Sequence, residues 1–339
     1  MQNKTTNHFL DCLKGIACIG VVFIHVHFPG FLGDIVWRLA QFAVPIFFMT
    51  SGYFVYSQDR EWITSTIKRR GKRILWLSTW STMLYWFITV GYVVAKNNCF
   101  LGGDNYLELL RMALRFVFLQ DVDFSGGGHL WFLWALLWSY IIVGFINRFN
   151  LWKQAHYSLP VLLVVMVMLS VLRSYYGWSW HSTGNAILGV TYVLIGHFIA
   201  ARIELVKRLA NQNLMIAIIL GEILALATFL PMKYDFSQIG LIVAASAMFV
   251  YAINNGEFVL NRGLEVIGHR YSLYIYVFHI LVNICLKKIE KITGVVDLTW
   301  FMAVHPVMVV LMTLLVAVVI ERLIKRGKMM LVATTDKMH

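Results

Sequence analysis

Residues 11–29 read DCLKGIACIGVVFIHVHFP, a run apolar enough to cross a bilayer as a helix. Four ionisable side chains interrupt it: Asp11, Lys14, His25 and His27. Because an α-helix turns by about 100° per residue, Lys14 and His25 lie on one stripe, about 16 Å apart along the axis. Asp11 precedes Lys14 by one turn, a spacing at which opposite charges pair. Ionisable groups are costly inside a membrane span, so the pattern predicts a functional site here.

The composition indicates a membrane protein. Of the 339 residues, 59% are apolar and 14% are charged, about half the charged fraction of a soluble domain. We therefore predict an all-α, polytopic membrane protein with a single domain over 1–339 and a retained first span rather than a signal peptide. About ten transmembrane helices are expected, at approximately 9–28, 35–57, 74–96, 129–149, 157–176, 183–203, 213–231, 236–255, 269–287 and 299–324.

The positive charge indicates a membrane surface as the partner rather than nucleic acid. The net charge is +12, and with ten spans and both termini in the cytoplasm, 20 of the 29 Lys and Arg residues fall on the inner side. This bias follows the positive-inside rule. The four cysteines, Cys12, Cys18, Cys99 and Cys285, lack the spacing of a metal site or a disulfide framework, so no metal is expected.

The second apolar segment, 35–57, is expected to kink at Pro45, and Ser51 with Gly52 should allow another backbone or a ligand to approach closely. The connection after it, 58–73, reads QDREWITSTIKRRGKR and is the densest basic patch of the chain. Two interpretations stay open. The patch either anchors the topology on acidic lipid headgroups or seats a phosphate-rich ligand on the cytoplasmic side.

Several later polar residues are candidates of lesser weight. The long outer connection 97–128 is expected to contain an amphipathic helix that caps the outer mouth. In the ninth span, Tyr274, Tyr276 and His279 form a polar spine that a lipid-facing helix would not need. His197 is expected to pack through a hydrogen bond, and His305, beside Pro306, is interpreted as part of a helix kink.

Five motifs, in order along most of the chain, resemble those of the acyltransferase-3 family of integral membrane enzymes. The first is Asp11, Lys14 and His25, where the family has an Arg or Lys, ten residues, then His. The others are VPIFFMTSGY at 44–53, RRGKRIL at 69–75, HLWFLWALL at 129–137 and SLYIYVFH at 272–279. The similarity is greatest to the compact branch that lacks an extracytoplasmic esterase-like domain. Lys14 stands where many members have Arg, and Lys lacks the bidentate fork of a guanidinium.

The resemblance implies transfer of an acyl group from cytoplasmic acyl-CoA, usually acetyl-CoA, to a hydroxyl of an extracytoplasmic or lipid-linked glycan. It places the protein in the bacterial inner (cytoplasmic) membrane, among membrane lipids, with a homo-oligomer left open. His25 would act as a base or carry the acyl group, Lys14 would orient the donor, and Asp11 would hold Lys14. The basic patch would hold the CoA phosphates, through Lys68, Arg69, Arg70, Lys72 and Arg73. Contacts to the acceptor, or support of the catalytic residues, are expected from Ser51, Tyr53, His129, Trp131, Tyr276 and His279.

Two other classes of function are weighed against the enzyme. A transporter or exporter of a small molecule or polysaccharide would also use ten spans, helices broken by proline and a polar spine. Carriers often contain two similar halves, and residues 1–170 show no similarity to 171–339. A membrane scaffold or sensor would leave Asp11, Lys14 and His25 without a role in an apolar span, so it ranks last.

Overall fold

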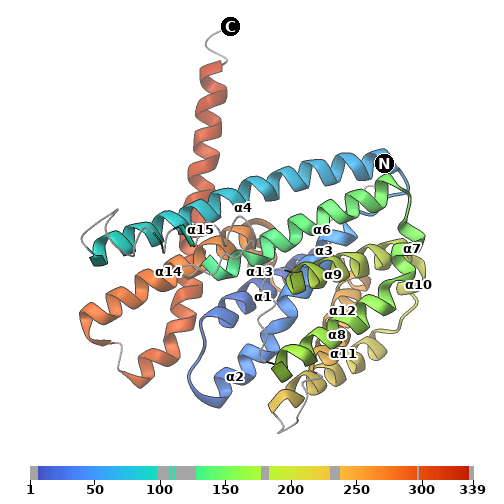
Figure 1. Ribbon diagram of the computed structural model, residues 1–339, viewed down its shortest axis with the longest axis horizontal. Coiled ribbons are helices and arrows are strands. Elements are labelled where there is room, and N and C mark those ends of the chain that lie inside the picture. The colour runs from blue at the N-terminus through green and yellow to red at the C-terminus, as the bar shows by residue number, and fades with distance from the viewer. Residues whose placement is uncertain are drawn as a thin grey trace. The chain divides into compact units, whose positions relative to one another are not determined.

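The structure is a computed structural model that describes residues 7–97, 107, 110–111, 127–176, 183–229, 237–295 and 298–335. Within these ranges every regular element is helical (Figure 1). The elements are α1 (His8–His25), α2 (Gly30–Leu39), η1 (Ala40–Phe42), α3 (Ala43–Tyr53), α4 (Arg60–Asn97), η2 (Gly127–Leu130), α6 (Trp131–Arg148), α7 (Trp152–Tyr157), α8 (Leu159–Tyr176), α9 (Thr183–Ala201), α10 (Ile203–Val206), α11 (Asn211–Leu226), η3 (Ala227–Phe229), α12 (Ser237–Asn254), α13 (Arg262–Val266), η4 (Ile267–Tyr271), α14 (Ser272–Thr293) and α15 (Thr299–Thr335).

Seven helical segments in the described part of the chain are long and apolar enough to cross a membrane. They coincide with seven of the ten expected spans, which confirms an all-helical, multi-pass architecture. Two further expected spans coincide with the shorter apolar helices Asn185–Ala201 and Asn211–Leu226. The remaining one, 74–96, lies inside α4. The ten-span topology and the cytoplasmic location of both termini stay predictions. Most of the 97–128 connection, with its expected amphipathic helix, lies outside the described residues.

The basic patch differs from its expected form. The sequence predicts that residues 58–73 are a connection between spans. In the structure, the patch from Arg60 onward is the first part of the 38-residue helix α4. Asp59 starts this helix, because its carboxylate accepts hydrogen bonds from the backbone N–H groups of Glu61 at 2.9 Å and Trp62 at 3.2 Å. Ile63 and Ile67 are buried, so this stretch has an apolar face as well as its basic one. Because Asp59 caps its start and residues 60–97 contain no proline, the helix continues without a break into the apolar stretch.

Backbone contacts divide the chain into two compact units, Met1–Ala43 with Asn255–His339, and Val44–Asn254. In the first unit α1 is the central helix and packs against α13, η4, α14, α15, α2 and η1. Two glycines allow a very close approach. A Cβ at Gly15 would lie 2.2 Å from the carbonyl oxygen of Leu264, and one at Gly268 would lie 1.9 Å from that of Asp11. The backbone before α14 is therefore held directly against the first two turns of α1.

The second unit is held by similar close contacts between helices. A Cβ at Gly52 on α3 would lie 1.9 Å from the carbonyl oxygen of Val193 on α9, which confirms the predicted close approach. Figure 1 shows α4 and α6 side by side in this unit, and α11 pairs with α12. The helix before α3 gives way to a 3₁₀ turn at Ala40–Phe42, one turn before Pro45. This position fits the interruption expected where proline removes a backbone hydrogen bond.

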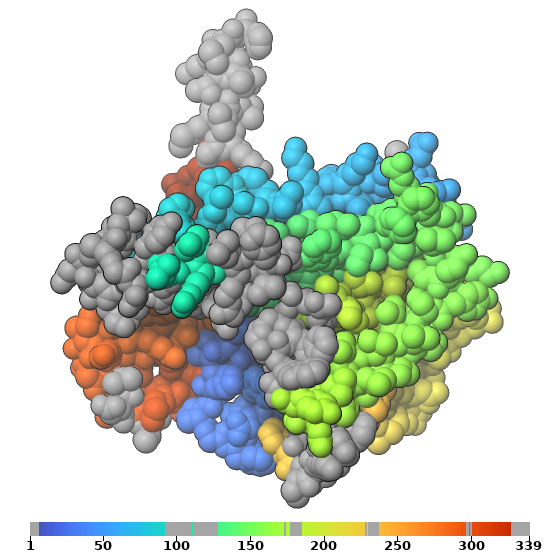
Figure 2. Space-filling view, in the orientation of Figure 1, coloured from blue at the N-terminus to red at the C-terminus, as the bar shows by residue number. Residues whose placement is uncertain are grey.

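The outer surface of the second unit carries large apolar side chains. Figure 2 shows α6 and α8 on the surface of this unit. Among their side chains Phe145 is 57% exposed and Val161 is 64% exposed, and on α4 Trp76 is 63% exposed. Such a surface suits contact with lipid rather than with water.

Candidate active site

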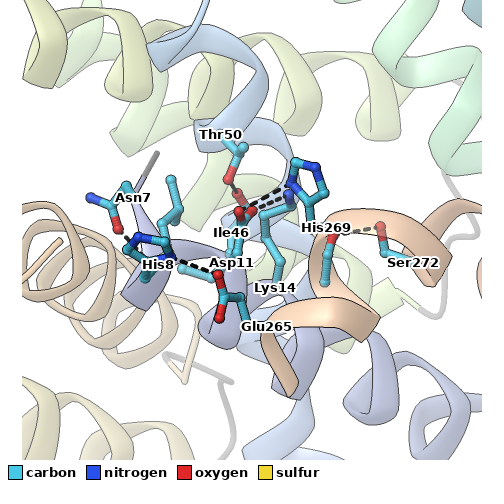
Figure 3. A network of polar contacts seen from close by, with 11 residues as sticks. Asn7, His8, Asp11, Lys14, Ile46, Thr50, Glu265, His269 and Ser272 are labelled. Atoms are coloured by element: carbon cyan, nitrogen blue, oxygen red, sulfur yellow. Dashed lines mark hydrogen bonds and ion pairs between the residues drawn. The ribbon is translucent and has the colours of Figure 1, made fainter. Parts of the chain in front are cut away.

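A network of charged groups lies in the first two turns of α1 (Figure 3). The Lys14 Nζ is 2.8 Å from Asp11 Oδ1, which is the pair that the one-turn spacing predicts. On the other side of the same carboxylate, His269 Nδ1 lies 3.2 Å from Asp11 Oδ2. Asp11 is 9% exposed. A buried carboxylate needs such partners, because an unpaired charge in this setting would be costly. The predicted Asp11–Lys14 pair is therefore present, and His269 is a further partner of Asp11.

A second acid–base pair lies beside the first. His8 Nδ1 is 2.6 Å from Glu265 Oε1, so the start of α1 is joined to α13. The side-chain oxygen of Asn7 caps α1 by accepting from Leu10 N at 2.7 Å, and that of Asn261 caps α13 by accepting from Leu264 N at 3.1 Å. Both helix starts therefore have defined positions within this unit.

His269 reaches Asp11 from a π-helical turn, η4, which joins α13 to α14. Single π turns inside helices occur frequently at functional sites, because the extra residue redirects side chains. Gly268 in this turn lies against the backbone of α1. The turn thus combines a backbone contact with a side chain aimed at the buried carboxylate.

At the other end of α1 the His25 ring faces the ring of His279 on α14. The two ring centroids are 5.3 Å apart, and the rings are inclined by 41°. His279 is fully buried, whereas His25 is partly accessible. Tyr276 stands one turn before His279, with its ring 6.2 Å away. Two imidazoles from segments about 250 residues apart in sequence therefore meet at the end of the stripe that begins with Lys14.

The hydrogen bonds of His279 define its tautomer. Its Nδ1 lies 2.8 Å from the carbonyl oxygen of Tyr276 and 3.1 Å from that of Ile275. Carbonyl oxygens only accept hydrogen bonds, so Nδ1 carries a proton. In the neutral ring the lone pair is then on Nε2, the nitrogen that acts as a base. The backbone of α14 thus sets which side of this imidazole can accept a proton.

A third acid–base group joins α14 to α15, which lie side by side in Figure 1. His305 Nδ1 is 2.5 Å from Glu290 Oε1, and its Nε2 is 2.8 Å from Asn283 Oδ1. All three residues are buried. Both ring nitrogens face side-chain oxygen atoms, so His305 bridges Glu290 and Asn283. The interpretation of His305 as part of a helix kink missed these partners.

Four of the predicted acceptor residues belong to the second unit. Ser51 donates a hydrogen bond to the carbonyl oxygen of Phe47 at 3.0 Å, and the ring of Tyr53 contacts that of Phe249 edge-on. His129 is 3% exposed, and its ring is 5.0 Å from that of Tyr85. Trp131 packs against Phe48 and Phe132, with centroids 6.4 Å from each. Their roles toward an acceptor stay predictions.

The predicted CoA-binding residues also belong to the second unit. They lie on α4, where all but the partly buried Arg70 are exposed: Lys68, Arg69, Lys72 and Arg73. Gly71 among them has open space where a Cβ would stand. The patch is thus a solvated basic helix face, a form compatible with both interpretations that its sequence left open.

A pair of histidines in the second unit matches the expectation for His197. Its Nδ1 is 3.0 Å from His156 Nε2, and its ring stacks on Trp152 with centroids 3.6 Å apart. His197 is 3% exposed, so the predicted packing through a hydrogen bond is confirmed. Burial, followed by the charge of Arg202, lowers the pKa of His156.

Sequence reasoning missed most of the partners in the first unit. His8, Glu265, His269 and the pair Glu290–His305 were found only in the structure, because their partners are distant in sequence or on another helix. One signal was present. Asn283 and Glu290 follow His279 by four and eleven positions, so they share its helical stripe, as His25 shares that of Lys14. No group of His, Cys, Asp or Glu suited to a metal ion occurs among the residues that the structure describes.

Comparison with known proteins supports the enzyme class. The family model described as an acyltransferase domain matches residues 7–322, which is nearly the whole chain and includes both units. No curated protein and no solved structure matches the chain significantly. The matched region contains the Asp11–Lys14–His269 network and the His25–His279 pair. With its acid–base groups on membrane-spanning helices and a match of this extent, the chain belongs to the acyltransferase-3 family of membrane acyltransferases.

Proposed function

We propose that the protein is an O-acyltransferase that moves an acyl group, most simply acetyl, from cytoplasmic acyl-CoA to a hydroxyl of an extracytoplasmic or lipid-linked glycan. The observation that carries this proposal is the His25–His279 pair, with ring centroids 5.3 Å apart. His25 of this pair stands on the same helix, α1, as the Asp11–Lys14 pair. Both units contribute to the matched family region, so we treat 1–339 as one working domain in the bacterial inner membrane.

The chemistry follows from what an imidazole can do near neutral pH. In the proposed step, His25 takes the proton of the acceptor hydroxyl as the oxygen attacks the thioester carbonyl. The new ester bond forms, the carbon–sulfur bond breaks, and the CoA thiolate leaves and takes up a proton. Alternatively, His25 attacks the thioester first and carries the acyl group to the acceptor. Both routes use the same residue and give the same products.

His279 supports either route. Its proton on Nδ1 is held by backbone carbonyls, so its Nε2 presents a lone pair and can accept or relay a proton within the pair. Lys14, held by Asp11 at 2.8 Å, supplies a fixed positive charge on the path of an anionic donor. We retain the basic face of α4 as the surface that attracts the donor from the cytoplasm.

The test compares two histidines at the same end of one helix. His27 is exposed, and its contacts are the carbonyl oxygen of Ile24 at 2.8 Å and the ring of Trp37, with centroids 6.1 Å apart, so His27→Ala is the matched control for His25→Ala. Membranes containing each variant are supplied with radiolabelled acetyl-CoA, and label in extracted glycans and glycolipids is measured. We expect His25→Ala to lose at least about a hundredfold in rate and His27→Ala to retain normal activity. Near-normal turnover of His25→Ala at equal protein level would remove His25 from the mechanism.

The same membranes distinguish the enzyme from a transporter. An acyltransferase releases one CoA thiol for each acyl group incorporated. A transporter would move its substrate across proteoliposomes without consuming acetyl-CoA. Substrate flux without thiol release would contradict the proposed function.

A further inference from the structure

A cavity of about 520 Å³ lies in the first unit, at the N-terminal end of α1. Its polar lining comes from α1 and from the segment before α14: His8, Asp11, Arg262, Glu265, His269 and Arg270. The volume is within the range of small-molecule sites. Figure 3 shows the α1 side of this lining, with Asp11 and His269 joined and His8 joined to Glu265. None of the five motifs that resemble the family includes residues 262–270. The sequence assigned Arg262 and Arg270 only to the positive charge expected on the inner side of the membrane.

The two acids of the cavity are already engaged. Asp11 has Lys14 at 2.8 Å and His269 at 3.2 Å, and Glu265 has His8 at 2.6 Å. A ligand that enters the cavity therefore meets carboxylates whose charge is balanced by a neighbouring cation or hydrogen-bond donor.

The two arginines of the cavity are differently placed. Arg262 and Arg270 are both exposed, and none of the ion pairs between described residues includes either guanidinium. Glu321 on α15 is close enough to feel the charge of Arg270, but its carboxylate is paired with Lys325 at 2.7 Å. The cavity thus presents two guanidinium groups on a lining whose acids are occupied. This is the arrangement that binds a phosphate through bidentate hydrogen bonds.

We infer that this cavity seats the diphosphate of the acyl-CoA donor, with Arg262 and Arg270 as its ligands. The inference rests on the proposed function, because it takes the donor to be an acyl-CoA. It assigns the phosphates to a formed cavity in the first unit, whereas the basic face of α4 has the lesser role of attracting the donor.

The reach of the donor agrees with this seat. Asp11 and His25 are fourteen residues apart on α1, which is about 21 Å along the axis. The pantetheine arm has thirteen bonds between the diphosphate and the sulfur, and at peptide-like bond lengths it extends to roughly 15 Å. Helical side chains lean toward the N-terminus of their helix, so the imidazole of His25 is tilted back toward the cavity. A thioester held by its diphosphate at this end of α1 therefore comes within about one helical turn of His25, and Lys14 lies between them.

The test measures CoA binding to the full-length protein in a detergent without anionic lipid, by calorimetry. The variants are Arg262→Gln and Arg270→Gln, singly and together. Arg208→Gln, an exposed arginine of the second unit outside any proposed site, is the matched control. We expect each single variant to weaken CoA binding about tenfold and the double variant more, because each removes charge-assisted hydrogen bonds to phosphate. Arg262→Lys and Arg270→Lys, which keep the charge but lose the fork, should fall between wild type and Gln.

The outcomes separate this inference from the proposed function. A wild-type protein that binds no CoA would overturn both. Wild-type affinity in a folded double variant, together with weakened binding in the triple variant Arg69→Gln, Arg70→Gln and Arg73→Gln, would overturn the cavity assignment and return the seat to α4. A further arm uses nanodiscs of phosphatidylcholine with or without phosphatidylglycerol. If the double variant lost only bound phosphatidylglycerol and kept its affinity for CoA, the cavity would be a lipid headgroup site and the inference would fail.

Discussion

The polar interiors of the two units are built from different partners. In the first unit acids pair with bases from a different helical element, as in His269–Asp11, His8–Glu265 and His305–Glu290. In the second unit His156 and His197 bond to each other, His197 stacks on Trp152, and the ring of His129 lies against that of Tyr85. The first arrangement orders groups that can carry charge and exchange protons, whereas the second orders rings mainly by packing.

This difference indicates where chemistry is best supported. A basic group on a solvated helix face, like those of α4, is screened and free to reorient. The charged groups of α1, α13 and α14 are held by helix caps, backbone contacts and ion pairs. A catalytic group must be held within a fraction of an ångström of its working position. The comparison therefore favours the first unit as the location of the reaction, and the experiments below test it.

The largest effect is expected from breaking a buried acid–base pair. His305→Ala leaves the carboxyl group of Glu290 buried without its hydrogen-bond partner, which should cost about 3–5 kcal/mol of unfolding free energy. His156→Ala in the second unit removes a hydrogen bond between a half-buried ring and the buried ring of His197, and it should cost about 1 kcal/mol. Unfolding in mixed micelles, followed by tryptophan fluorescence, measures both. Equal losses would mean that the two interiors are energetically alike. The double variant His305→Leu with Glu290→Leu, which removes both buried polar groups, should recover much of the stability.

A smaller effect is expected at the glycine that brings η4 against α1. In Gly268→Ala the new Cβ would lie 1.9 Å from the carbonyl oxygen of Asp11, so the turn must move, at a cost of about 1–3 kcal/mol. Because the turn carries His269 and Arg270, CoA affinity should fall as well. The control is Gly71→Ala on α4, where the Cβ meets open space and helix propensity predicts a gain of about 0.5–1 kcal/mol. A stable Gly268→Ala protein with unchanged CoA affinity would show that the close contact does not position the cavity.

The smallest effect is a pH dependence in the second unit. Burial lowers the pKa of His156 below its ordinary value, so between the two values the unfolded chain binds more protons than the folded one. Stability from this group is therefore fully present above about pH 6.5 and is lost as the pH falls below it. The thermal midpoint should drop between about pH 7.5 and about pH 5.5 by less in His156→Gln than in wild type. An identical drop in both proteins would exclude His156 as the source.

Residue spacing within a single helix predicted the main polar features of α1. The spacing of Asp11, Lys14 and His25 predicted the ion pair and the stripe, and the close approach at Gly52 was also expected from the sequence. Apolar runs located the long apolar helices, but not all of their ends: α4 begins at Arg60 rather than at 74, and α15 extends to Thr335 rather than to 324. The prediction that the basic patch is a connection was wrong. Asp59 caps the start of a helix there, and Ile63 and Ile67 give that helix a buried face.

Contacts between distant segments were beyond those rules. The meeting of His25 with His279, and of Asp11 with His269, joins segments about 250 residues apart in sequence. A π turn at Ile267–Tyr271 has no spacing signature that separates it from an ordinary helix start. From the sequence, Arg262 and Arg270 only contribute positive charge to the inner side of the membrane. The local sequence does not reveal that the neighbouring acids Asp11 and Glu265 are paired with Lys14 and His8. The sequence shows which side chains can be charged, and tertiary packing decides which of these side chains remain available to a ligand.

The most direct test of the central claim is a density map of the protein with an acetyl-CoA analogue in which a methylene group replaces the sulfur, so that the acyl group cannot be transferred. We predict density for the diphosphate between Arg262 and Arg270 and for the acyl end beside the His25–His279 pair. An ordered analogue whose acyl end lies away from both imidazoles would contradict the account.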